Sequence, residues 1–156
     1  MASFSVLADA RRVGLDAKAP TVDPAVEASP RHLERALGNL LDNAVRYTKA
    51  GGVVDVAVTA DDARALVTVA DSCGGIEREV VVDFENGNGR HRGDHAGETG
   101  LGLAIAKGLV EAQGGEISLE STGRGCRFTI ALPLASLDQA GRGVHTIAAG
   151  GETLTA

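Results

Sequence analysis

The feature that most constrains the fold is a helical pattern over residues 31–47. Its apolar residues recur at spacings of three and four, which places them on one face of an α-helix. Ser29 and Pro30 come directly before this pattern and are residue types that favour the N-cap and first position of a helix. Such a helix must bury its apolar face against another element, so the chain is predicted to fold as packed layers.

The predicted order after this helix is hairpin, loop, helix, hairpin. Alternating or apolar strand patterns predict two hairpins, formed by residues 53–59 with 66–70 and by residues 116–121 with 126–132. The second helix is predicted over residues 101–113, ending at Gly114. This order predicts an α+β fold, a two-layer α/β sandwich with the helices on one face of a mixed, mostly antiparallel sheet.

Three further segments connect these elements. Residues 12–17 are predicted to form an edge strand and residues 77–83 a short helix. Residues 85–98 have no hydrophobic period and are predicted to form a mobile loop. The length of 156 residues suits one domain, which is predicted over residues 11–133, after a lead-in (1–10) and before a flexible tail (134–156).

Composition excludes several classes of protein. The net charge of −6 argues against a nucleic-acid binder, which usually needs a basic face. Two cysteines, Cys73 and Cys126, do not make a disulfide framework and are expected to be reduced thiols. No apolar run approaches the ~20 residues needed to cross a bilayer, and the N-terminal residues do not resemble a secretion signal. We therefore expect a cytoplasmic protein without membrane insertion.

Asn39 and Asn43 are the first candidate site residues. They are four residues apart on the first helix, so they share one face, beside the apolar stripe. An unsatisfied buried amide costs about 1–3 kcal/mol, so both side chains need a partner. That partner is either backbone or a ligand such as Mg²⁺, which accepts amide oxygens. Arg46 and Tyr47 follow one turn later, and a cation and an aromatic ring there suit a nucleotide.

Two glycine-bearing segments are the next candidates. Asp71 ends a strand before Ser-Cys-Gly-Gly-Ile76, and a carboxylate there can accept a hydrogen bond from an adenine amine. The alternative is an ordinary Asp-Gly turn. Residues 97–103, Gly-Glu-Thr-Gly-Leu-Gly-Leu, lead into the second helix, where free backbone N–H groups attract phosphate. They are not a Walker loop, because no Gly-Lys-Ser/Thr follows.

Taken together, the three segments resemble a known family. Residues 39–48 (Asn-Leu-Leu-Asp-Asn-Ala-Val-Arg-Tyr-Thr), 71–76 and 99–103 are similar to the N box and the first two glycine boxes of sensor histidine kinases, in their catalytic, ATP-binding domain. Residues 123–128 are similar to the last glycine box. This GHKL superfamily also includes DNA gyrase, MutL and heat-shock chaperones, and the resemblance implies their Bergerat-type sandwich.

The resemblance implies one Mg-ATP site. Its predicted ATP-binding residues are Asn39, Asn43, Arg46, Tyr47, Asp71, Gly75, Ile76, Thr99, Gly100, Leu101, Gly102, Leu103 and Thr129. Asn43 is the implied metal ligand, supported by Asn39. Asp71 is implied to bind the adenine amine.

The other implied roles concern the base and the phosphates. Arg46 is implied to touch phosphates and Tyr47 to pack against the base, with Gly75 beneath it. The glycines of residues 99–103 are implied to meet phosphates, and residues 84–98 to form an ATP lid. Thr129 is implied to reach the base through water.

The chain departs from the family pattern at several positions. Cys73 and Glu98 stand where glycine is usual, and a positive φ at Cys73 would be strained. Of the aromatic stretch that usually precedes the lid, Phe84 remains. None of the four histidines, His32, His91, His95 and His145, resembles a phospho-acceptor followed by an acid.

These features lead to one expected function and two alternatives. The expected function is a histidine kinase that transfers the γ-phosphoryl group in trans to a histidine on a separate protein, which passes it to a response regulator. An anti-sigma-factor-type serine kinase is less favoured, because those kinases resemble hydrolysing ATPases in placing Glu where Asn39 stands, and an amide cannot act as a base. The third reading is a nucleotide-binding module without catalysis.

Overall fold

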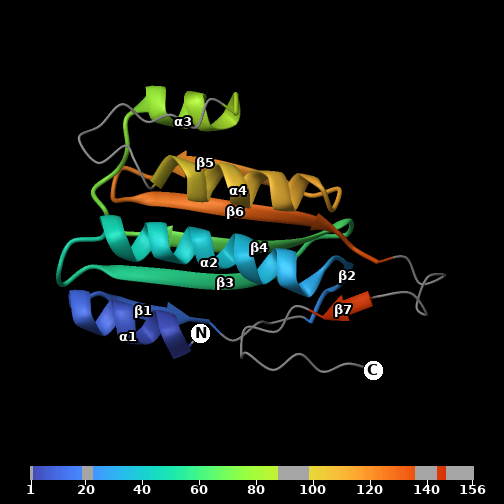
Figure 1. The fold of residues 1–156 in the computed structure, drawn as a ribbon, viewed down its shortest axis with the longest axis horizontal. Helices are drawn as coiled ribbons and strands as arrows, with labels where there is room; N and C mark the ends of the chain where they lie inside the picture. Colours follow the sequence, from blue (N-terminus) through green and yellow to red (C-terminus); the bar gives the residue numbers. More distant parts are fainter. Residues whose placement is uncertain (1, 19–22, 88–98, 136–143, 147–156) are drawn as a thin grey trace.

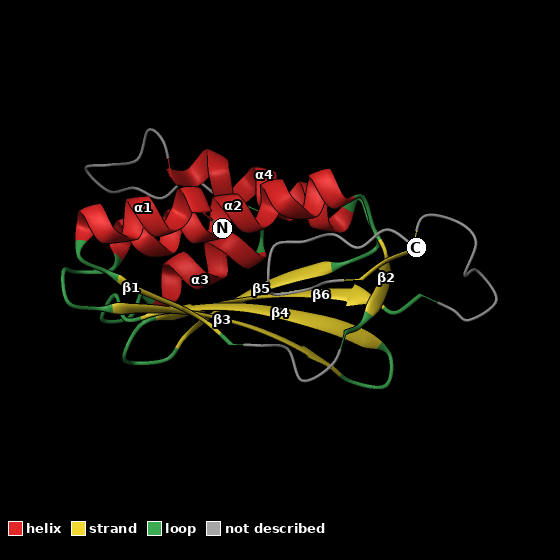
Figure 2. Ribbon diagram, turned by 90° about the horizontal axis from the view of Figure 1, so that it is seen from below, coloured by secondary structure: helices red, strands yellow, loops and turns green. Residues whose placement is uncertain are grey.

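The computed structural model describes residues 2–18, 23–87, 99–135 and 144–146, and shows two layers (Figure 1). The helices are α1 (Ala2–Arg11), α2 (Pro30–Tyr47), α3 (Arg78–Glu85) and α4 (Thr99–Glu111). All four lie on the same face of the main sheet (Figure 2). The predicted two-layer α+β sandwich is confirmed. None of these described helices has both the length and the apolar content that crossing a membrane requires.

The main sheet has five strands in the order β1-β3-β4-β6-β5. Their bounds are β1 Gly14–Ala17, β3 Val53–Ala60, β4 Arg64–Asp71, β5 Glu116–Ser121 and β6 Cys126–Pro133. Strand β1 pairs with β3 in parallel, and every other pairing in this sheet is antiparallel. The sheet is therefore mixed and mostly antiparallel, as predicted, with β4 as its middle strand.

The core lies between this sheet and the helices. On α2, the buried apolar residues occupy the predicted stripe, and Leu40, Ala44 and Val45 are inaccessible to solvent. The strands contribute every second residue, such as Val67 and Val69 on β4, because side chains alternate between the faces of a sheet. Nearly all of this core is aliphatic, in keeping with the 3% aromatic content of the chain.

The start of α2 is stabilised by the end of α4. Ser29 is the N-cap residue, as predicted, but its side chain makes no capping hydrogen bond. Its backbone N–H instead donates to Gln113 Oε1 at 2.6 Å, and Gln113 Nε2 donates to the Leu109 carbonyl at 2.7 Å. The two long helices are thereby joined at one end.

Three elements, α1, β2 (Ala25–Glu27) and β7 (Val144–Thr146), were not predicted. Residues 2–11 form α1, in which Ala8 is buried, and Arg12 follows with a φ of 56°. Within the predicted tail, β7 pairs antiparallel with β2 in a second, two-stranded sheet. That pairing joins residues more than a hundred positions apart, and a local pattern cannot indicate such a partner.

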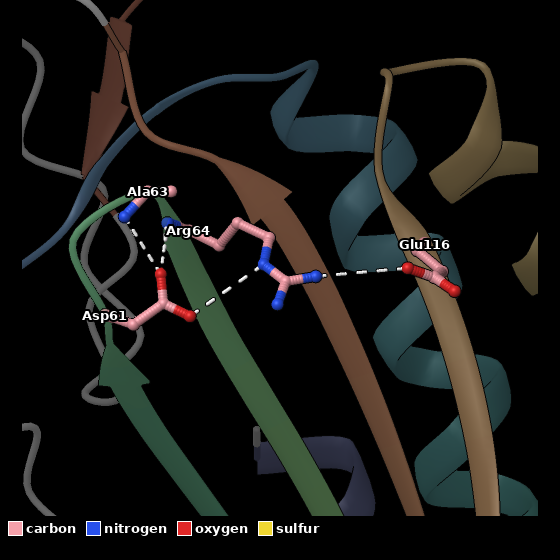
Figure 3. Close-up of polar contacts among 4 residues, drawn as sticks. All are labelled: Asp61, Ala63, Arg64 and Glu116. Carbon is pink, nitrogen blue, oxygen red and sulfur yellow. Dashed lines mark hydrogen bonds and ion pairs between the residues drawn. The ribbon is translucent and has the colours of Figure 1, made fainter.

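The turn between β3 and β4 is closed by a carboxylate (Figure 3). Asp61 Oδ1 accepts the backbone N–H groups of Ala63 and Arg64 at 2.9 and 2.7 Å. These two donors, Ala63 first, hold the pKa of Asp61 below its ordinary value. Arg64 also lies 3.9 Å from Glu116 of β5.

Candidate nucleotide-binding site

The amide pair on α2 has unsatisfied polar atoms. Asn39 Nδ2 and Asn43 Oδ1 are buried and have no hydrogen-bond partner among the described residues. Asn43 is 9% exposed, on a helix whose neighbouring residues form the core. These two atoms are therefore not hydrogen-bonded to described backbone groups, which was the alternative to a ligand. An amide oxygen with free lone pairs is a ligand that Mg²⁺ accepts, so Asn43 fits the metal role implied for it.

The glycine segment of α4 faces this pair. A Cβ added at Gly102 would lie 3.8 Å from both Cγ and Oδ1 of Asn39. Thr99 and Gly100 form the first turn of α4, where backbone N–H groups lack helical partners and favour anions. Leu103 is buried in the core, whereas Leu101 is 66% exposed. Two segments that are about sixty residues apart in sequence are thus brought together, as the site prediction requires.

Asp71 ends the middle strand of the sheet with its carboxylate held in place. Its Oδ1 accepts the backbone N–H of Cys73 at 3.0 Å and that of Cys126 at 3.1 Å. The residue is 9% exposed. Because both backbone bonds end on Oδ1, Oδ2 is left for a donor such as an amine of a bound base.

The turns around Asp71 depend on glycine. Gly74 and Gly75 have φ values of 101° and 96°, and the Gly74 N–H donates to the Arg124 carbonyl at 2.9 Å. A Cβ at Gly125 would overlap the backbone carbonyl of Asp71, so only glycine fits there. Sequence reasoning did not select Gly125 as a site residue, although its place in the last glycine box was a usable signal.

The strain considered for Cys73 does not arise. Among the described residues, Arg12 is the non-glycine residue with positive φ, and the left-handed positions of this turn fall on Gly74 and Gly75. Ile76 follows them, with its N–H donating to Ser121 Oγ at 3.2 Å and its side chain partly packed on the core.

The end of α2 lies next to the turn after β4. A Cβ at Gly52 would come within 2.6 Å of Ser72 Oγ and would overlap the Thr48 side chain, so these segments are in close contact. Arg46 is ion-paired with Asp42 at 2.9 Å, and Tyr47 is 45% exposed. Both predicted residues are therefore accessible at the rim of the site.

Thr129 lies on the other face of the sheet. Its neighbours in β6, Phe128 and Ile130, are buried under the helices, and side chains alternate along a strand. Thr129 pairs with Thr68 and Ser118 in the ladder and is only partly buried. The structure does not bring it to Asp71, and Cys126, at the start of β6, occupies that place instead.

The base of the predicted lid is anchored to α4. Phe84 is buried in α3 and contacts Phe128 edge to face at 5.8 Å. Lys107 of α4 donates to the carbonyls of Phe84 and Glu85 at 3.0 and 2.7 Å, and its Nζ lies 5.4 Å from the Phe84 ring centroid. No sequence signal indicated Lys107. Residues 88–98, with most of the predicted lid, Glu98, His91 and His95, lie outside the described residues.

Comparison with known protein families identifies the family to which this chain belongs. Residues 28–136 match the model of the histidine kinase-, DNA gyrase B- and HSP90-like ATPase family. The chain belongs to this family. The match includes α2, the sheet strands β3 to β6 and all three site segments, so the resemblance inferred from those segments is confirmed.

Within the family, the relatives of this ATPase domain are sensor histidine kinases. It is 35% identical to sensor histidine kinase RppB of Synechocystis over 86% of this chain and 30% of the relative. It is 36% identical to sensor histidine kinase RcsC of Escherichia coli over 74% of this chain and 12% of the relative. The chain thus spans less than a third of the length of these relatives.

Solved structures agree. The ATPase domain matches the mycobacterial sensor histidine kinase MprB with a TM-score of 0.68 and 27% identity, covering 87% of this chain and 93% of that one. It matches full-length ShkA in complex with AMPPNP with a TM-score of 0.73 and 28% identity, covering 86% of this chain and 28% of that one. The fold described above is therefore that of a histidine kinase catalytic domain.

Proposed function

We propose that this ATPase domain binds Mg-ATP and transfers the γ-phosphoryl group in trans to a histidine on a separate phospho-acceptor protein, which passes it to a response regulator. The observation that carries the proposal is the pair of unsatisfied amide atoms, Asn39 Nδ2 and Asn43 Oδ1, with Asn39 lying beside Gly102 near the start of α4. A buried pair of this kind is stabilised by a polar ligand. The AMPPNP complex of ShkA, a structural neighbour, supports a nucleotide as that ligand.

The proposed roles follow from the chemistry of each group. Asn43 Oδ1 would hold Mg²⁺, which neutralises phosphate charge when it is bound. The amine of adenine would donate to Asp71 Oδ2, since the backbone bonds end on Oδ1. The N–H groups in the first turn of α4 would receive the phosphates, and Arg46 would leave Asp42 for them. Catalysis here consists of positioning and charge neutralisation.

The nature of residue 39 favours histidine over serine as the acceptor. A serine hydroxyl must lose its proton to a base, and Asn39 offers a neutral amide at the position closest to Gly102. An imidazole nitrogen attacks with its own lone pair and needs no such base. None of the four histidines in this sequence resembles an acceptor, which supports an acceptor outside these residues.

Nucleotide binding is tested with a variant that changes one atom of the site. Asp71→Asn keeps the Oδ1 acceptor for both backbone N–H groups but replaces Oδ2 with an amide donor, which would oppose the adenine amine. We expect binding of a fluorescent ATP analogue to weaken at least tenfold, the scale of one lost hydrogen bond. Asn43→Ala should weaken binding and abolish its Mg²⁺ dependence.

Asp61→Asn is the matched control. Asp61 also accepts two backbone N–H groups through Oδ1, at the opposite end of β4 (Figure 3). Its replacement should leave nucleotide affinity unchanged. Unchanged binding in both Asp71→Asn and Asn43→Ala would remove the proposed site.

Phosphotransfer is tested with labelled ATP and a protein that carries a histidine phospho-acceptor helix. We expect acid-labile, base-stable phosphate on that protein, as for phosphohistidine, and no stable label on the ATPase domain alone. Acid-stable label would support the serine-kinase alternative, and binding without transfer would support a nucleotide-binding module. Self-labelling would show that the acceptor lies in this chain.

A further inference from the structure

The two cysteines of the chain meet beside Asp71. Cys73 Sγ, in the turn after β4, lies 3.1 Å from Cys126 Sγ, the first residue of β6, and both are free thiols. Cys126 is 5% exposed, whereas Cys73 is partly accessible. A pair with one accessible and one buried thiol allows a small oxidant to reach the first and the second to resolve the product.

The backbone positions also suit a covalent bond between the cysteines. The N–H groups of both residues donate to one atom, Asp71 Oδ1, at 3.0 and 3.1 Å. The two nitrogens are therefore no more than about 6 Å apart, so the two backbones lie close to each other, as a disulfide requires. A disulfide of ~2.05 Å then needs a sulfur movement of only about 1 Å.

The geometry favours a disulfide over a metal centre. Asp71, Cys73 and Cys126 place their ligand atoms within 4.8 Å of one another, which is a possible three-ligand site. A tetrahedral zinc with Zn–S bonds of ~2.3 Å would hold its sulfurs roughly 3.8 Å apart. The observed 3.1 Å is shorter, and Asp71 Oδ1 already accepts two N–H groups.

We propose that Cys73 and Cys126 form a site of reversible oxidation beside Asp71, at the proposed adenine end of the nucleotide-binding site. The Cys73 thiolate attacks one oxygen of a peroxide and becomes a sulfenic acid. The other oxygen of the peroxide is protonated and leaves as water or alcohol. The Cys126 sulfur then attacks the Cys73 sulfur, the S–S bond forms, and the sulfenic oxygen leaves as water. In the balance, two thiols lose two protons and two electrons and the peroxide gains them; a thiol reductant reverses the reaction.

The consequence for nucleotide binding rests on the proposed function. The disulfide would join the 71–76 turn covalently to β6 and hold the Cys73 sulfur against Cys126. The turn that contains Gly74 and Gly75 would then be less able to adjust to a bound base. We expect oxidation to lower nucleotide affinity roughly tenfold, as for the loss of one hydrogen bond to the base.

The covalent step is tested directly on the whole chain. Reduced protein is treated with stoichiometric hydrogen peroxide, and unreacted thiols are then alkylated under denaturing conditions. We expect loss of two hydrogens from the intact mass, no alkylation, a Cys73–Cys126 cross-linked peptide after digestion, and full recovery with dithiothreitol. Two alkylated cysteines, or a sulfinic acid on Cys73 without a cross-link, would overturn the proposal.

The effect on binding is measured separately with reduced and oxidised protein. Wild type should lose affinity on oxidation, while Cys73→Ser, a near-isosteric change at a partly exposed position, should bind equally before and after peroxide. A cross-link without a change in nucleotide affinity would overturn the proposed effect on binding but not the proposed disulfide. If the reduced protein bound no nucleotide, the proposed function would fail, and the cross-link would still be decided by mass.

Discussion

The carboxylate of Asp71 orders two turns before it meets any ligand. Its Oδ1 accepts N–H groups from the turn after β4 and from the start of β6, which brings two glycine-bearing segments around one atom. Gly125 lies against the Asp71 carbonyl on the other side. A change at any of these residues therefore alters both the fold and the proposed site. The two effects can be distinguished only by substitutions that retain the Oδ1 acceptor.

A substitution at Gly102 tests nucleotide affinity and folding stability separately. A Cβ there meets nothing closer than 3.8 Å, so Gly102→Ala fits and should stabilise α4 by up to about 1 kcal/mol. The same methyl group narrows the approach to Asn39, so nucleotide affinity should fall. The measurements are urea denaturation and nucleotide titration.

Gly108→Ala is the control for this prediction. Gly108 lies on the same helix, and a Cβ there meets nothing within 4 Å. We expect a similar gain in stability with unchanged nucleotide affinity. Loss of binding in both variants, or in neither, would contradict a specific role for Gly102.

The thiols lead to a prediction about pH. Burial, followed by the nearby Asp71 carboxylate, raises the pKa of Cys73 above its ordinary value of 9.0, and burial raises that of Cys126 further. The thiolate is the reactive form, so a raised pKa slows the reaction of Cys73 at neutral pH, and both alkylation and oxidation should become faster as the pH rises. Alkylation of Cys73 by iodoacetamide in the folded protein should therefore reach half of its maximal rate above pH 9, whereas the unfolded chain should reach half of its maximal rate at about pH 8.5.

Asp71→Asn removes the negative charge from this site. The titratable groups described around Cys73 are Asp71 and Cys126, and the carboxylate raises the pKa of Cys73. The alkylation profile of the variant should move to lower pH. A plateau below pH 9 in the folded wild type would contradict the assigned direction of the shift.

At the residue scale, the sequence was informative where the argument was local. Asn39 and Asn43 share a helix face because of the helical period, and Asp71 ends its strand because the apolar alternation stops there. Cys126 and Lys107 escaped notice because their roles depend on contacts across 53 and 22–23 residues of sequence. Thr129 is three positions from Cys126 in the same strand, and an odd number of positions reverses the face to which a side chain points, so it lies away from Asp71.

At the element scale, α4 joins the proposed phosphate-binding turn to α3. Lys107 donates to two carbonyls at the C-terminal end of α3, where a cation is favourable, and lies over the Phe84 ring. Lys107→Met keeps the apolar stem and removes the donors. We expect a loss of about 1–2 kcal/mol in the free energy of unfolding, measured by urea denaturation.

An exposed lysine provides the comparison for that variant. Lys49→Met removes the same charge from the loop after α2, where the side chain is exposed. Its stability should change by less than about 0.5 kcal/mol. Equal losses in both variants would show that net charge, not the contact with α3, is responsible.

The elements themselves were largely predictable. Both long helices and the four strands of the two hairpins lie within a few residues of their predicted ends, because each carries a complete period and a capping or glycine boundary. α1 was not predicted because residues 2–11 lack a strong amphipathic pattern and depend on packing against α2 and β1.

At the scale of the whole molecule, nucleotide binding and folding are linked. A ligand that binds only the folded chain stabilises it by RT ln(1 + [L]/Kd), which is about 2.7 kcal/mol at a hundredfold excess over Kd. Mg-ATP should therefore raise the thermal midpoint by several degrees, and ATP with a chelator by less. Asn43→Ala should show no difference between the two conditions, and a wild type insensitive to both would contradict the proposed site.

The two-layer architecture could be predicted because few folds are compatible with this order of helices and strands. The small β2–β7 sheet could not be predicted. Its strands have three residues each and come from distant parts of the chain. Three residues cannot display a period, so their structure follows from where the rest of the fold brings them.

The position of β4 has a consequence for how the protein opens. As the middle strand, β4 has its amides bonded to β3 on one side and β6 on the other, and Asp71 stands at its end. Central strands exchange their amide hydrogens only when the entire domain opens, while peripheral elements exchange through smaller fluctuations. The floor of the proposed adenine site should thus be among the slowest parts of the sheet to exchange.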